Sequence, residues 1–264
     1  MTKQGVEINF EGRIINCYYP AFGKNYRDSF QRVKNKARGL RIPLNVASME
    51  QLAICLREIY CKNGNNPQLT KIKYAFDSGF PPFWTSTIAF TVVRNDKIGH
   101  PAGIFTYDFK RLNDEVPKIQ ELWKSVNEKG ARNEKGLRTS HDRKVRFAQY
   151  GTEWYRHDHG NATHRDKSDW EINLEQNSIV RALATDIGAR CLAEIAAKTK
   201  MKSLVCAVSA NQFPKDRSIE RDEWIAHIRR NSSMLNIGWY YNSLFPDNLA
   251  LPVWETTETK DCLI

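Results

Sequence analysis

The sequence lacks long apolar runs, paired cysteines and glycine-rich nucleotide motifs. No apolar run approaches the roughly 18 residues that a transmembrane helix needs, so we expect no membrane partner. The six cysteines form no Cys-x-x-Cys pair, which argues against a disulfide framework or a cysteine-based zinc site. There is no P-loop, no Gly-x-Gly-x-x-Gly and no Gly-x-Ser-x-Gly motif. Walker-type hydrolysis, dinucleotide cofactors and α/β-hydrolase chemistry are therefore not expected.

The cysteines that are present lie mostly in apolar segments, which is typical of reduced, buried thiols in a cytoplasmic protein. The first five residues, Met-Thr-Lys-Gln-Gly, carry no apolar stretch, so we predict no secretory signal. Cytoplasmic localisation is the resulting expectation.

Charge is the most informative bulk property. Lys and Arg total 40 and Asp and Glu total 30, which gives a net charge of +10. A phosphate backbone is attracted to such a surface by Coulomb forces and by the release of its counterions. We therefore expect nucleic-acid binding, with single-stranded RNA or DNA favoured, and other protein subunits of a nucleoprotein complex as further partners. A protein-interaction module that binds an acidic partner is an alternative.

The periodicity of apolar residues predicts an α+β or mixed α/β fold. The N-terminal sheet should be antiparallel-rich, and the C-terminal half should be helix-rich with one long helix. We expect residues 1–126 to form a mixed sheet and helix part, 127–144 a basic loop or linker, and 145–264 the helix-rich part. One continuous domain is compatible with the length of 264 residues.

Particular elements follow from local signals. Alternation over 6–10, followed by Glu11-Gly12, predicts a hairpin with 13–19. Ser48 and Gln51 form a capping box, as do Ser168 and Glu171, and each should begin a helix. Gly188 should allow another element to approach the long helix closely. The other predicted elements are strands at 69–76, 87–93, 103–109, 203–210 and 237–241, helices near 119–130, 169–199 and 219–231, and an irregular segment at 20–45.

The first candidate site combines cations with aromatic rings between Gly23 and Arg41. Cations follow a phosphate backbone while aromatic faces stack on bases, at about 1–3 kcal/mol per base. Tyr26 or Phe30 would stack on bases. The cationic residues of this site are Lys24, Arg27, Arg32, Lys34, Lys36, Arg38 and Arg41.

A second basic segment lies inside 127–144 and just beyond it. Arg138, Arg143 and Lys144 are its strongest candidates for contacts with a phosphate backbone. Nearby acidic residues dilute its charge, so a solvated surface is the simpler alternative.

A third candidate is a histidine cluster. On a strand, His157 and His159 would point to the same face, with Asp158 between them and His164 nearby. Two imidazoles and a third ligand could hold Mg²⁺, Mn²⁺ or Zn²⁺, and the metal would activate water in a nuclease or phosphoesterase. His157, His159 and His164 are the metal-ligand candidates, and His157, Asp158 and His159 are catalytic candidates.

A fourth candidate lies in the helix expected at 219–231. Arg221 and His227 are separated as Arg-polar-x4-His, which resembles the short signature of HEPN ribonucleases. The resemblance covers seven residues and implies that Arg221 stabilises phosphate charge while His227 acts as acid or base. An exposed helix face with internal ion pairs is the structural alternative.

Overall fold

The computed structural model describes residues 5–62, 66–78, 81–92, 103–109, 117–134, 136–149, 154–156, 161–164, 174–208, 225–231, 234–240 and 248–257. Within these ranges no helix is both long enough and apolar enough to cross a membrane. The fold is mixed α+β, and most strand pairs are antiparallel, as the periodicity predicted.

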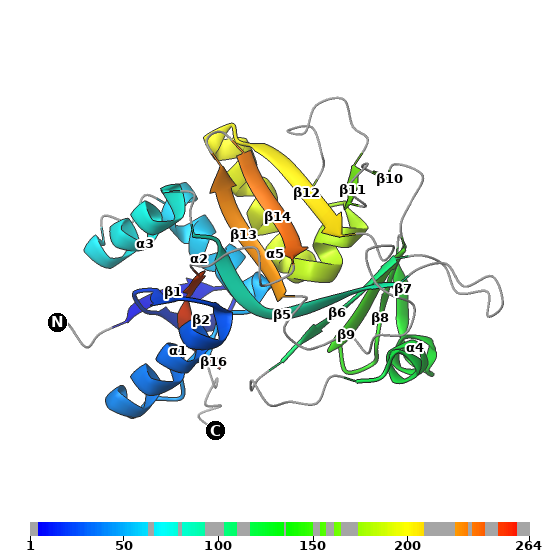
Figure 1. Ribbon diagram of the computed structural model, residues 1–264, viewed down its shortest axis with the longest axis horizontal. Helices are drawn as coiled ribbons and strands as arrows, with labels where there is room; N and C mark the ends of the chain where they lie inside the picture. Colours follow the sequence, from blue (N-terminus) through cyan, green and yellow to red (C-terminus); the bar gives the residue numbers. More distant parts are fainter. Residues whose placement is uncertain are drawn as a thin grey trace, which may run out of the picture.

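A four-stranded sheet lies beside helix α1 (Tyr26–Leu40) at one end of the molecule (Figure 1). Its strands, in spatial order, are β1 (Val6–Phe10), β2 (Arg13–Cys17), β16 (Pro252–Thr257) and β4 (Asn45–Val46). β1 and β2 form the predicted hairpin, with Phe10 opposite Arg13. Glu11 and Gly12 have positive φ angles of 49° and 77°, as a two-residue hairpin turn of the primed type requires.

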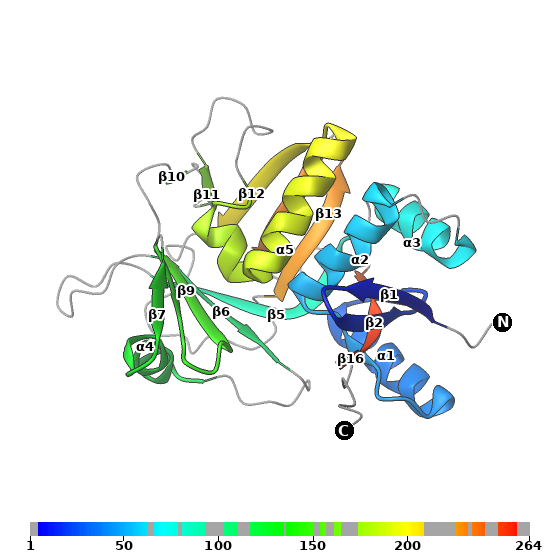
Figure 2. The same cartoon turned by 180° about the vertical axis from the view of Figure 1, so that it is seen from behind.

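A larger, strongly twisted sheet crosses the rest of the molecule (Figures 1 and 2). Ten of its strands, in spatial order, are β10 (Trp154–Arg156), β11 (Asn161–His164), β12 (Lys202–Val208), β14 (Met234–Tyr240), β13 (Ile225–Asn231), β5 (Phe83–Val92), β6 (Gly103–Asp108), β9 (Val145–Gln149), β8 (Leu137–Thr139) and β7 (Arg132–Glu134). Two more strands extend the sheet to the side of β5: β15 (Asn248–Ala250) pairs with β5, and β3 (Ala21–Gly23) pairs with β15. Among the described strands, only β12–β14 and β15–β5 pair in parallel. The strands predicted near 87–93, 103–109, 203–210 and 237–241 are thus confirmed.

Five helices are found in the described part of the chain, and they pack around the two sheets. They are α1 (Tyr26–Leu40), α2 (Met49–Cys61), α3 (Pro67–Asp77), α4 (Ile119–Asn127) and α5 (Ser178–Thr199). α5 lies along one face of the large sheet, and α2 packs beside it (Figure 2). The predicted capping box of α2 is present, because Ser48 Oγ accepts from the N–H of Gln51 and the Gln51 side chain accepts from the N–H of Ser48.

Residues 20–45 are not irregular, as the sequence suggested, and residues 69–76 are not a strand. Most of the first segment is α1, which begins after the capping side chain of Asn25. The second lies in α3, where Asn66 is the N-cap and Pro67 occupies the first turn. Leu69, Ile72 and Phe76 are buried at helical spacing, whereas Tyr74 is 79% exposed. The apparent alternation of a strand was therefore misleading.

The long helix is confirmed in shortened form. α5 begins at Ser178 after its N-cap Asn177. The capping box predicted for Ser168 and Glu171 lies outside the described residues. Thr185 interrupts the helix with a φ of 62° and a ψ of 177°, a combination that is nearly restricted to glycine. Gly188 lies where α2 crosses, since a Cβ built there would be 3.1 Å from Glu50 Cα, so the predicted close approach is confirmed.

The chain beyond residue 126 also differs from the expected arrangement. Residues 225–231 form β13 between β14 and β5 instead of the end of a helix. The basic segment 127–144 contains the β7–β8 hairpin, which extends the large sheet from β9. Among the described residues after 145, one helix accompanies strands β9 to β16, so the helix-rich description is not supported.

Candidate functional site

Helix α1 presents a basic face to solvent. Its apolar side buries Tyr26, Phe30 and Val33, so the intervening positions must face outward. Asn25 caps the helix, because its Oδ1 accepts from the N–H of Asp28 at 2.9 Å. We call the outward cations the α1 basic face. It consists of Lys24, Arg27, Arg32, Lys34, Arg38 and Arg41, which are all exposed.

Three of these cations form a line along the helix. Arg27, Lys34 and Arg38 recur at i, i+7 and i+11, which places Lys34 and Arg38 about 20° to either side of Arg27 around the axis. The rise per residue spreads them over about 16 Å. No described carboxylate forms an ion pair with Lys34 or Arg38.

The α1 basic face carries one internal anion. Asp28 accepts from the backbone N–H of Lys24 at 3.0 Å and from Nε of Arg32 at 3.2 Å. These two hydrogen bonds lower the pKa of the Asp28 carboxyl. Arg32 is therefore already paired, and it is a weaker candidate for a phosphate contact than Lys34 or Arg38.

The predicted stacking residues are in the core. Tyr26 and Phe30 are only 3% and 5% exposed, and their rings contact each other, so neither can stack on a base. Tyr19 and Phe22, which flank the start of the basic segment, are instead 53% and 49% exposed. The ammonium of Lys36 donates to the carbonyl of Tyr19 at 3.0 Å, and burial lowers the pKa of Lys36. Lys36 thus holds the Tyr19 loop in place instead of extending the α1 basic face.

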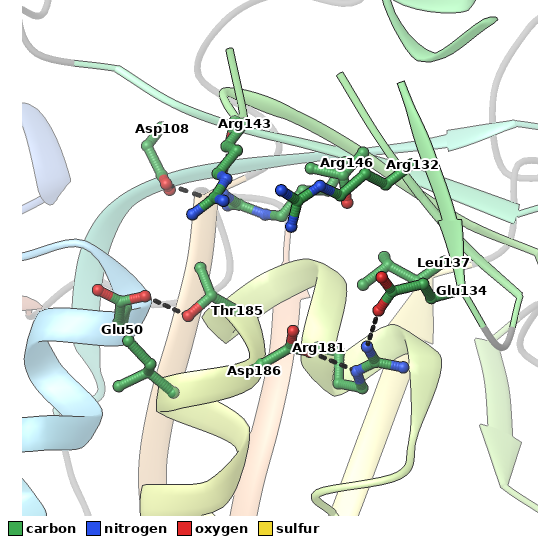
Figure 3. A pocket seen from close by; sticks show the side chains of 12 residues that line it. Glu50, Asp108, Arg132, Glu134, Leu137, Arg143, Arg146, Arg181, Thr185 and Asp186 are labelled. Carbon is green, nitrogen blue, oxygen red and sulfur yellow. Dashed lines mark hydrogen bonds and ion pairs between the residues drawn. The ribbon is translucent and has the colours of Figure 1, made fainter. Parts of the chain in front are cut away.

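The second basic segment is divided by the fold. Arg138 donates to Asn127 Oδ1 at 2.8 Å, and Lys144 pairs with Asp142 at 3.2 Å. Arg143 points the other way, into a pocket of about 380 Å³ between the large sheet and helices α2 and α5 (Figure 3). We call this cavity the arginine pocket. Its polar lining residues are Glu50, Asp108, Arg132, Glu134, Thr139, Arg143, Arg146, Arg181, Thr185 and Asp186.

The sheet side of the arginine pocket is a cationic wall. Arg132, Arg143 and Arg146 approach one another there, with Asp108 the carboxylate beside them (Figure 3). Arg146 is only 4% exposed and is held by Asp108 at 3.0 Å and by the carbonyl of Ala182 at 2.6 Å. Neither Arg132 nor Arg143 forms an ion pair with any described carboxylate.

The helix side of the pocket is built around the break in α5. Thr185 donates its hydroxyl hydrogen to Glu50 Oε2, and Arg13 holds the other oxygen of the same carboxylate. The N–H of Gly188 points at Thr185 Oγ1 at 3.5 Å, so Thr185 acts as the N-cap of the second half of the helix. Farther along this wall, Arg181 pairs with Asp186 and lies 3.8 Å from Glu134.

The catalytic and metal candidates are largely untested by the geometry. His157, Asp158, His159 and Arg221 lie outside the described residues, and of His164 only the backbone is described, in β11. Within the described ranges, His, Cys, Asp and Glu side chains form no group of three that could hold a metal.

His227 is described, and its position differs from the predicted one. It lies in β13 instead of an exposed helix, is fully buried, and contacts the ring of Trp84 at 5.2 Å. Burial, with a smaller effect from Arg229, lowers the pKa of His227 to about 3. A buried, neutral imidazole in a strand does not match the exposed helix face on which the acid or base was predicted.

Comparisons with protein-family models, with curated proteins and with solved structures find no match for this chain. Its candidate sites therefore rest on their own geometry. Sequence reasoning missed Glu50, Arg181 and Thr185, which are separated along the chain and meet only in the folded pocket. A helix break without Gly or Pro at residue 185 gave no local signal.

Proposed function

We propose that this protein binds single-stranded nucleic acid through the α1 basic face. The observation that carries the proposal is the line of Arg27, Lys34 and Arg38 on a helix whose opposite side is buried. A rigid helix holds such cations at fixed spacing, so phosphates can be neutralised without first ordering a flexible loop. Phosphate contacts of this kind supply affinity without base specificity.

Two exposed aromatic rings favour unpaired bases over a duplex. Tyr19 and Phe22 lie on the segments that lead into α1, and Lys36 joins the Tyr19 backbone to the helix. Base stacking on such rings contributes about 1–3 kcal/mol per base and requires that the bases be unpaired. RNA and DNA single strands are both suitable ligands.

The test is a salt titration of binding to labelled single-stranded RNA, single-stranded DNA and duplex DNA. With about six phosphates neutralised, log affinity should fall with log salt at a slope of roughly −4 to −5. The triple variant Arg27→Gln/Lys34→Gln/Arg38→Gln should make the slope shallower by about 2, because each single-strand contact contributes about 0.7. The double variant Tyr19→Ala/Phe22→Ala should weaken single-strand binding and leave duplex binding unchanged.

The matched control removes the same charge elsewhere. Lys71, Lys198 and Lys200 are exposed on α3 and at the end of α5, away from α1 (Figures 1 and 2). Changing all three to Gln should have little effect on the slope. A slope near zero in the parent protein, or equal losses in both triple variants, would contradict the proposal. Binding of an acidic protein but of no nucleic acid would favour the protein-interaction alternative.

A further inference from the structure

We propose that the arginine pocket is a second, independent site that binds a phosphate monoester of a small hydroxylated molecule, a class that includes sugar phosphates and nucleoside monophosphates. The α1 basic face is an open surface, whereas this pocket is a cavity of about 380 Å³, within the range of small-molecule sites.

The phosphate assignment rests on the pairing of the arginines. Arg146 and Arg181 are nearly buried, and each already forms an ion pair with a carboxylate, Asp108 and Asp186 respectively. Arg132 and Arg143 point into the same space and have no such partner among the described residues (Figure 3). Arginine guanidinium groups bind phosphate through paired hydrogen bonds, and several together favour a dianion over a carboxylate. Arg132 and Arg143 are therefore the expected phosphate ligands, with Arg146 behind them.

The rest of the ligand is inferred from the opposite wall. There the carboxylates of Glu50 and Asp186 face the pocket, with the Thr185 hydroxyl between them (Figure 3). Carboxylates accept hydrogen bonds, so this wall is suited to hydroxyl or amino donors and would repel a second phosphate. A ligand with phosphate at one end and hydroxyl groups at the other matches both walls.

The geometry of this wall is fixed by the fold. Arg13 and Thr185 each hold one oxygen of Glu50, so its carboxylate keeps one orientation. Thr185 itself adopts a positive-φ backbone conformation that is strained for a residue with a side chain. Such fixed groups lose little entropy when a ligand binds.

The experiment is calorimetric titration with ribose 5-phosphate, adenosine 5′-monophosphate, inorganic phosphate and adenosine. We expect at least one of the two esters to bind more tightly than inorganic phosphate, and adenosine to bind weakly. Arg132→Ala/Arg143→Ala should weaken binding of that ester at least tenfold. The matched control is Arg138→Ala/Lys144→Ala, which removes two neighbouring cations that point away from the pocket and should change affinity less than twofold.

Several outcomes separate this proposal from its rivals. The ester that binds better identifies the source of the phosphate group, since one carries a base and the other does not. Absence of ester binding at millimolar concentration, equal affinity for inorganic phosphate and the esters, or equal losses in both double variants would overturn it. The Arg27→Gln/Lys34→Gln/Arg38→Gln variant should bind the ester normally, so this site can fail or succeed independently of nucleic-acid binding.

Discussion

The hydroxyl of Thr185 donates a hydrogen bond to the carboxylate of Glu50, which connects the break in α5 to the first turn of α2. The two residues are far apart in sequence, and neither belongs to a recognisable motif. Their contact holds one wall of the arginine pocket and positions the strained backbone of Thr185 at its edge (Figure 3). The stability of this junction can be tested apart from any ligand.

Thr185→Gly should be more stable than Thr185→Ala, against the usual order in helices. Both variants lose the hydrogen bond to Glu50, but glycine relieves the positive φ that alanine retains. We expect a difference of about 1 kcal/mol or more in the free energy of unfolding, measured by urea denaturation. Ser125, inside α4, is the control position. There Ser125→Gly should be less stable than Ser125→Ala by about 0.5–1 kcal/mol. If the alanine variant were the more stable one at both positions, the backbone of Thr185 would not be strained.

Gly188→Ala should destabilise the protein although alanine favours helices. A Cβ at this position would be 2.9 Å from Ala184 Cβ and 3.1 Å from Glu50 Cα, so α2 and α5 would have to separate. We expect a net loss of about 1–2 kcal/mol in the free energy of unfolding, because overpacking exceeds the gain of about 1 kcal/mol in helix propensity.

Gly39→Ala is the matched control for that loss. Gly39 lies near the end of α1, and a Cβ added there would have no neighbouring atom within 4 Å. This variant should be as stable as the parent or more stable by up to about 1 kcal/mol. If both alanine variants were stabilising, the close crossing of α2 and α5 would be wrong.

Arg146→Met should reduce stability by about 3 kcal/mol in chemical denaturation. Arg146 is buried, and its loss removes the cationic partner of Asp108 and one of the two donors to the Ala182 carbonyl. Arg132→Met removes an exposed arginine from the same pocket and should change stability by less than about 0.5 kcal/mol. Adding Asp108→Asn to Arg146→Met should recover part of the loss, and no recovery would mean that the pair is not coupled.

Stability should fall as the pH is lowered from 7 to 5, and His227 should be a main cause. Its pKa in the folded protein is about 3, below the ordinary value of 6.5, so the unfolded chain takes up a proton that the folded protein does not. The contribution of His227 to stability is therefore fully present above pH 6.5 and is lost as the pH falls toward 3. The contribution of His227 between pH 7 and 5 is about 2 kcal/mol.

His227→Leu removes the titrating imidazole. The free energy of unfolding, measured by urea denaturation at each pH, should then change less between pH 7 and 5. The range from pH 7 to 5 lies above the pH at which carboxylates with lowered pKa values, such as Asp28 and Glu255, take up protons. An unchanged slope in the variant would show that the imidazole is accessible to protons in the folded state.

Local signals predicted the elements whose stability is local. The Ser48–Gln51 capping box and the Glu11-Gly12 turn each depend on neighbouring residues, so the sequence was sufficient for the helix and for the hairpin. Where a sequence pattern fitted both a strand and a helix, the predicted element was wrong. Ile72, Tyr74 and Phe76 alternate like a strand, but the helical spacing of Leu69, Ile72 and Phe76 matches what is buried.

The helix predicted around residue 227 was wrong for a related reason. A short apolar run can be a helix or a strand, and pairing with β14 and β5 decides between them. β14 follows β13 closely in the chain, but β5 is distant, so a window around His227 contains only part of the information. The burial of Tyr26 and Phe30 likewise followed from α1 being a helix, which the sequence interpretation had missed.

The sequence by itself determined the excess of positive charge and its concentration between residues 24 and 41, because charge is a sum over side chains and needs no fold. Only the tertiary structure decided that these cations line one face of α1 and that Arg143 meets Arg132 beside Glu50 and Thr185. Helix phase and strand pairing set which distant side chains share a space, and both are fixed by burial of the core across the whole chain.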